Sequence, residues 1–108
     1  VNTPVDQTTS VTVRCTSNTS YSVSMDMGLG SGVTDPEYRL MTNGVETLSY
    51  GLYRDSGYSQ PWGNLPGNDV DWTGTGSDNN FTVYGRIHSG QTAVLGTYTD
   101  NVVVTVTY

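Results

Sequence analysis

The chain has 108 residues, 34% of them hydrophobic and 13% charged, with a formal net charge of −6 at pH 7. This length accommodates one domain with one modest core, so residues 1–108 are predicted to form a single domain. Four arginines and no lysine leave no cationic surface for phosphate, which argues against nucleic acid and anionic membranes as partners.

Glycine, threonine, serine and asparagine are abundant, with 13 glycines in the chain. This mixture disfavours long helices and favours short strands joined by tight turns. No stretch approaches the roughly 18 consecutive apolar residues of a membrane span, and the first residues lack the pattern of a signal peptide. We therefore expect a mature, soluble, β-rich product.

The first strand is predicted over residues 10–15, after an extended polar lead-in at 1–9. Apolar and polar residues alternate there, which is the period of a strand with one buried face. Turn-forming residues occupy 16–20, and a second alternating segment covers 21–27. The simplest arrangement pairs these two segments as neighbouring antiparallel strands.

A hairpin is predicted in the middle of the chain. Residues 28–36 form a glycine-rich loop, and 38–42 can form a short strand before the turn signal Asn43-Gly44. The strand across the turn is predicted at 47–54. Its apolar face carries Leu48, Tyr50 and Leu52, with Tyr53 on the opposite face.

Two further strands are predicted in the second half. Residues 55–80 contain both tryptophans but few aliphatic side chains, so most of this segment is expected to be surface loop. Alternation returns at 81–88 and again at 98–108, where valines occupy one face. Six or seven strands without a helical period predict an all-β fold, a two-sheet sandwich.

Several segments occur in the order known from one protein family. They are VTVRC at 11–15, LSYGLYRD at 48–55 followed by Trp62-Gly63, FTVYGRI at 81–87 and GTYTDNVVVTVTY at 96–108. In this ordered set the chain resembles the spore coat protein U domain family, whose fold is that of subunits of archaic chaperone–usher pili. The resemblance implies an immunoglobulin-like β-sandwich that lacks its final strand and is completed by a donor strand from a partner.

The resemblance also implies how such a subunit works. A periplasmic chaperone first fills the groove beside the last strand, and the N-terminal extension of a neighbouring pilin subunit then replaces it, with export through an outer-membrane usher. The product is a fibre on the bacterial cell surface that supports adhesion and biofilm formation. Residues expected to line the groove are the inward side chains of the last strand, Val102, Val104, Val106 and Tyr108. The alternative is that they are ordinary core, complete within the chain.

Cys15 is the only cysteine, which suggests a partner outside the chain or an inert buried thiol. Members of the family that the chain resembles carry a further N-terminal segment with a strand and a first cysteine. That cysteine pairs with the cysteine at the position of Cys15. The chain is therefore expected to lack that segment, and the disulfide partner of Cys15 is expected to lie outside these residues.

Three side chains in the long loop region raise a second hypothesis. Trp62, Leu65 and Trp72 lie among Gly, Pro and Asn, and loop aromatics can stack on sugars or contact hydrophobic surfaces. The chain could then be a tip adhesin or a carbohydrate- or surface-binding module. The alternative is that Trp62 packs over one end of the sandwich. A spore coat structural protein that assembles by the same strand chemistry is a third possibility.

No arrangement of residues predicts catalysis, so the chain is not expected to be an enzyme or to need a cofactor. The lone His88 is expected to point outward into solvent, without a supporting nucleophile motif. Asp69, Asp71 and Asp78 could gather a calcium ion, but they lack EF-hand spacing and a solvated loop is the preferred interpretation, so no metal site is predicted.

Overall fold

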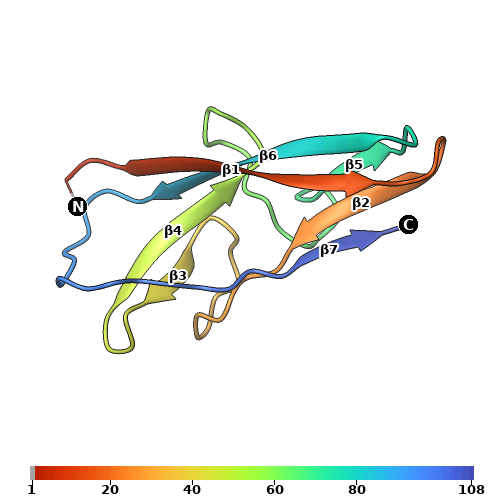
Figure 1. Cartoon of the computed structure of the whole chain (residues 1–108). Helices are drawn as coiled ribbons and strands as arrows, with labels where there is room; N and C mark the ends of the chain where they lie inside the picture. The colour runs from red at the N-terminus through yellow and green to blue at the C-terminus, as the bar shows by residue number, and fades with distance from the viewer. Residues whose placement is uncertain (1) are drawn as a thin grey trace.

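The computed structural model describes residues 2–108, which form seven β-strands in two antiparallel sheets (Figure 1). The strands are β1 (Val5–Arg14), β2 (Ser20–Met25), β3 (Arg39–Thr42), β4 (Thr47–Tyr53), β5 (Val70–Thr73), β6 (Asp78–Ile87) and β7 (Val104–Thr107). Sheet 1 has the order β1-β6-β4-β3, and sheet 2 has the order β5-β2-β7. The predicted all-β sandwich is therefore confirmed. Within the described residues no helix is long and apolar enough to cross a membrane.

The expected pairing of the first two strands is wrong. β1 pairs along its whole length with β6, from Val5 opposite Ile87 to Arg14 opposite Asp78, and β2 pairs with β5 and β7 in the other sheet. The segment between β1 and β2 thus connects the two layers. β1 also begins at Val5, inside the expected lead-in, because the ten-residue β6 offers a partner to its polar first half.

The predicted hairpin is confirmed at the turn after β3. β3 and β4 pair from Arg39 opposite Tyr50 to Thr42 opposite Thr47. Gly44 has a φ of 103°, which a residue without a Cβ adopts readily, and Oδ1 of Asn43 accepts hydrogen bonds from the backbone amides of Val45 and Glu46. Tyr53 lies on the face of β4 opposite Leu52, yet it is buried because Tyr58 packs edge-on against its ring.

Three strands in the second half of the chain differ from expectation. β5 lies inside the segment expected to be loop, and β6 begins at Asp78 rather than at residue 81. β5 is missed because three of its four residues are exposed, so no apolar alternation marks it. The last strand is shorter than expected, since only Val104–Thr107 pair with β2.

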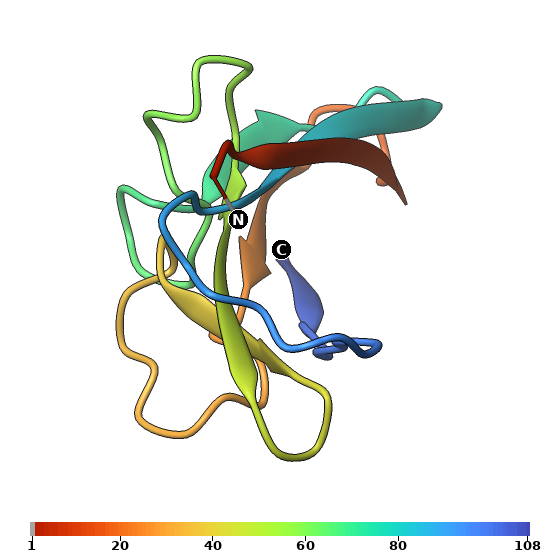
Figure 2. The same cartoon turned by 90° about the vertical axis from the view of Figure 1, so that its left-hand side faces the viewer.

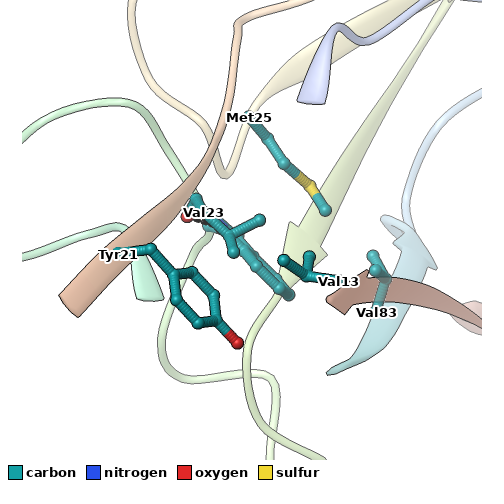
Figure 3. Close-up of a cluster of buried hydrophobic side chains, with 6 residues drawn as sticks. Val13, Tyr21, Val23, Met25 and Val83 are labelled. Carbon is teal, nitrogen blue, oxygen red and sulfur yellow. Dashed lines mark hydrogen bonds between the residues drawn. The ribbon is translucent and has the colours of Figure 1, made fainter. Parts of the chain in front are cut away.

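The core lies between the two sheets and is small. Its main cluster of buried side chains consists of Val13, Tyr21, Val23, Met25, Trp62 and Val83, and Leu48, Tyr50 and Tyr53 of β4 are also buried. Figure 3 shows the side chains of β2 meeting Val13 of β1 and Val83 of β6. Trp62 is 1% exposed, and its indole nitrogen donates a hydrogen bond to the backbone oxygen of Val23 at 2.9 Å, so this loop residue joins the core.

One charged side chain is completely buried. Arg39 at the start of β3 is 0% exposed, and its guanidinium donates to the backbone oxygens of Met25, Asp26, Pro36 and Trp62. Burial lowers the pKa of Arg39, while the neighbouring Tyr50, Asp26 and Asp100 act in the opposite direction. Arg39 therefore ties the end of β2, the loop before β3 and the Trp62 turn to one another.

Candidate functional site

An open border separates the two sheets along one side of the sandwich. β1 ends sheet 1 and β7 ends sheet 2, so within residues 2–108 neither strand has a partner on its outer side. Figure 2 looks along the sandwich, with β1 above and β7 below this opening. Unpaired strand edges present free N–H and C=O groups to any further strand. We call the space between β1 and β7 the open groove.

The valines of the last segment form one wall of the open groove. Val104 pairs with Met25 and Val106 with Val23, and both partners are buried, so these valines face the interior. Val102 and Val106 pack against the core. Val104 is nevertheless 39% exposed, because no side chain of residues 2–108 covers it from the open side. An inward-facing valine with this exposure marks a core that lacks one layer.

The opposite wall of the open groove is the inner face of sheet 1, which the sequence interpretation missed. A hollow of about 280 Å³ lies there, and its apolar lining includes Val5, Leu52, Gly85 and Ile87. Val5 is 53% exposed. The only sequence signal was the apolar alternation of β4 and β6, which predicts a buried face but does not say which part of that face stays uncovered.

Cys15 and Tyr108 lie at the end of the open groove, where β1 and β7 end. They share a second hollow, of about 270 Å³, with Arg14, Thr16 and Thr19. Tyr108 lies just beyond the end of β7 and is 90% exposed, whereas Cys15 is half-buried against the core. Cys15 is a free thiol among the described residues.

Two aspartates hold the segment before β7 in place. Asp26 accepts hydrogen bonds from the amides of Gly28 and Val103, and its own amide donates to the Val103 oxygen. Asp100 accepts from the amide of Leu29 and from the hydroxyl of Tyr50. These bonds position the valine wall relative to β2 and β4.

The buried Tyr50 hydroxyl predicts loss of stability at high pH. Burial raises the pKa of Tyr50, as does its hydrogen bond to Asp100. A tyrosine in the unfolded chain ionises near pH 10, so only the unfolded state loses this proton just above that pH. The free energy of unfolding should therefore hold up to about pH 10 and then fall by as much as about 1.4 kcal/mol per pH unit for this group.

Denaturant titrations between pH 8 and 11 test this, with the pH range chosen around the ordinary tyrosine pKa of about 10. Tyr50→Phe should flatten the alkaline fall, whereas Tyr108→Phe, at a 90% exposed position, should leave it unchanged. Burial and Glu37 also raise the pKa of Tyr53, so part of the fall should remain in Tyr50→Phe. An identical alkaline slope in Tyr50→Phe and the parent chain would contradict the assignment.

The structure separates the three loop residues of the adhesive hypothesis. Trp62 is in the core, so its expected role as a surface contact is wrong. Leu65 is 62% exposed and Trp72 is 53% exposed. Trp72 packs edge-on against Phe81, with ring centroids 5.8 Å apart, and lines a hollow on the side of the sandwich away from the open groove.

The remaining polar candidates do not converge. Asp78 pairs with Arg14 at 3.2 Å, and no group of three or more metal-ligating side chains occurs in the part of the chain that the structure describes. His88 is half-buried rather than fully solvated as expected, because its ring lies 5.2 Å from the Tyr38 ring. Its Nε2 is 2.6 Å from the backbone oxygen of Glu37.

Known proteins are similar to this chain in sequence and in fold. Residues 1–105 match the model of the Spore Coat Protein U domain. Protein U of Myxococcus xanthus is 36% identical over 107 residues, which cover 94% of this chain and 59% of that protein. A solved structure, the CsuC-CsuE chaperone-tip adhesion subunit pre-assembly complex from archaic chaperone-usher Csu pili of Acinetobacter baumannii, matches with a TM-score of 0.73 and 26% identity over 97% of this chain.

The chain spans only part of these relatives, 59% of Protein U and 34% of the matched chain in the Csu complex. The match in fold nevertheless extends over almost the whole chain. It agrees with the immunoglobulin-like sandwich that the sequence resemblance implied.

Proposed function

The chain belongs to the Spore Coat Protein U domain family, and from this we propose that it is a structural subunit of a secreted bacterial surface fibre of the chaperone–usher kind. The matched Csu complex contains a chaperone and a tip adhesion subunit, which supports a periplasmic chaperone and neighbouring fibre subunits as partners. Export through an outer-membrane usher, and roles in adhesion and biofilm formation, belong to the same proposal.

The open groove carries the proposal. Val104 faces the interior and is still 39% exposed, and the wall opposite contains the uncovered Val5. A strand inserted between β1 and β7 can use the free edges of both sheets and bury alternate side chains against both walls. Assembly would then complete the fold of one subunit with a segment of another.

The energetic reason lies in the apolar surface that the groove leaves in water. Full burial of one valine stabilises a fold by about 1.5–3 kcal/mol. The inserted strand would cover several apolar side chains at once and would pair backbone groups that otherwise contact solvent. The isolated subunit should therefore be weakly stable, and a periplasmic chaperone would protect the groove until the next subunit fills it.

A synthetic donor strand tests the proposal. A peptide of ten residues, the length of β1, with alternating valine and threonine should bind and raise the melting temperature. At a free concentration of about 100 times its Kd, the gain is about 2.7 kcal/mol, or roughly 10–20 °C for a domain of this size. Thermal melts with and without the peptide measure it.

A peptide of identical composition but with the valines clustered at one end is the matched control. In an extended strand its valines fall on both faces of one half, so it has no apolar face along its whole length. It should therefore leave the melting temperature nearly unchanged. An isolated chain that is already highly stable and responds to neither peptide would count against donor-strand assembly.

A coat protein that assembles through the same groove is a second candidate. It is favoured by the 36% identity to Protein U and by the family to which the chain belongs. Electron microscopy of cells producing the full protein distinguishes the two, because a pilus subunit forms thin fibres and a coat protein forms a continuous layer. A position at the fibre tip, as an adhesin, is compatible with the same groove.

A further inference from the structure

A second border of the sandwich is also incomplete, on the side opposite the open groove. β4 pairs with β6 only between Tyr84 and Ile87, so the first half of β6 extends past the end of β4. β5 is the edge strand of sheet 2 on the side opposite β7. Between β5 and this half of β6 lies a hollow of about 300 Å³, lined by both polar and aromatic side chains. This volume is at the lower end for small-molecule sites.

An aromatic side chain forms one wall of this hollow. Trp72 is 53% exposed, although its ring contacts Phe81 at an interplanar angle of 88°. In this perpendicular arrangement the two rings do not stack, so much of the indole surface stays in water. An exposed indole with a rigid aromatic neighbour is a suitable platform for the apolar face of a flat ring.

One residue of the polar lining carries a positive charge. Arg54 is the only charged residue among the lining side chains. Its Nη1 donates a long hydrogen bond of 3.3 Å to the backbone oxygen of Asp69, and its Nε is shielded from solvent without a hydrogen-bond partner. A ligand in the hollow could not reach the shielded Nε, but it could reach the Nη groups. Among the described residues these groups make only the one long hydrogen bond to Asp69, so a carboxylate would supply them with a charged acceptor.

Further donors surround this cation. Asn80 accepts a hydrogen bond from Thr12 through Oδ1, so its Nδ2 remains a donor at the rim. Thr82 and Tyr84, which each carry a hydroxyl group, are also lining residues. An aromatic platform, one guanidinium, an amide and two hydroxyls together match a ring that carries hydroxyl groups and one carboxylate.

We propose that this hollow binds one unit of an acidic polysaccharide, with the sugar ring on Trp72 and its carboxylate at Arg54. A neutral sugar would offer Arg54 only hydroxyl and ring oxygens, which bind a guanidinium more weakly than a carboxylate does. This site goes beyond the proposed fibre function, and its position away from the open groove allows both to be occupied together.

Isothermal titration calorimetry with short oligogalacturonate at low salt tests the proposal. The methyl ester of the same oligosaccharide is the matched probe, because it removes the charge of the carboxylate and adds only a methyl group. The acid should bind at least about tenfold more tightly than the ester. Arg54→Gln should remove this difference by weakening only the binding of the acid.

Substitutions at the aromatic wall provide the second readout. Trp72→Ala should weaken acid binding by about tenfold, and Trp72→Phe should retain most of it. Leu65→Ala, an exposed loop residue outside the hollow, should bind as the parent chain does. If Arg54→Gln does not fold, the comparison of acid and ester still tests the charge.

Three results would overturn the proposal. They are equal affinity for acid and ester, unchanged affinity in Trp72→Ala, and no binding at about 10 mM oligosaccharide. None of them bears on the donor-strand peptide, which binds at the opposite border. Either proposal can therefore be contradicted without affecting the other.

Discussion

Replacing Arg39 by glutamine is expected to lower the free energy of unfolding by about 3–5 kcal/mol, enough to unfold a weakly stable subunit. The guanidinium is 0% exposed and donates to backbone oxygens from three separate segments, with distances of 2.6 Å to Trp62 and 2.7 Å to Pro36. Glutamine is too short and has too few donors to reach them all. Buried carbonyl groups would remain without partners.

The destabilisation caused by Arg39→Gln should extend to the open groove. Arg39 also holds the backbone oxygen of Asp26, and the side chain of Asp26 binds the amide of Val103, next to the valine wall. Urea denaturation measures the effect. Arg14→Gln is the matched control, because that arginine is exposed and its bridge to Asp78 should contribute less than about 1 kcal/mol. Similar midpoints for the two variants would show that the buried network contributes little.

Replacing Val104 by aspartate is expected to abolish capture of the alternating peptide while leaving the isolated chain folded. In the free subunit this side chain is 39% exposed, so a carboxylate there can keep part of its hydration. A donor strand would cover it and bury an unpaired charge, which costs several kcal/mol. A penalty of about 3 kcal/mol weakens binding by more than about 100-fold.

Thr105→Asp is the matched control for this prediction. It introduces the same charge one residue away, on the exposed outer face of β7, where an inserted strand leaves the side chain in water. Its affinity for the peptide, measured by calorimetry, should stay within a few fold of the parent value. Equal loss of binding in both variants would indicate a general charge effect and not a groove with an inner face.

The two incomplete borders have different chemistry. The open groove is apolar and lies between two strand edges, which suits a backbone with alternating apolar side chains. The hollow beside Trp72 contains a guanidinium, an amide and hydroxyls, which suit a small polar ligand. One subunit could therefore assemble through one border and bind a surface polysaccharide through the other.

The local pattern of the sequence determined the strands and the central hairpin. Period-2 alternation identifies a strand with a buried face from its own residues, so β2, β4 and most of β6 were predicted close to their true bounds. Asn43-Gly44 specifies a turn because both residues tolerate the backbone conformation it needs. The inward direction of Val104 and Val106 follows from the same alternation.

Only the tertiary structure decided which strands pair, which edges stay open and which polar residues are buried. Strand pairing depends on contacts between distant segments, so nothing within β1 shows that its partner is β6 and not β2. The burial of Arg39 and Trp62 depends on backbone carbonyl groups that lie far away in the sequence, such as that of Trp62 for Arg39 and that of Val23 for Trp62. Val104, Val5 and Trp72 are exposed because no other strand or loop covers them. A local sequence pattern can show which face of a strand a side chain lies on. It cannot show whether another segment covers that face.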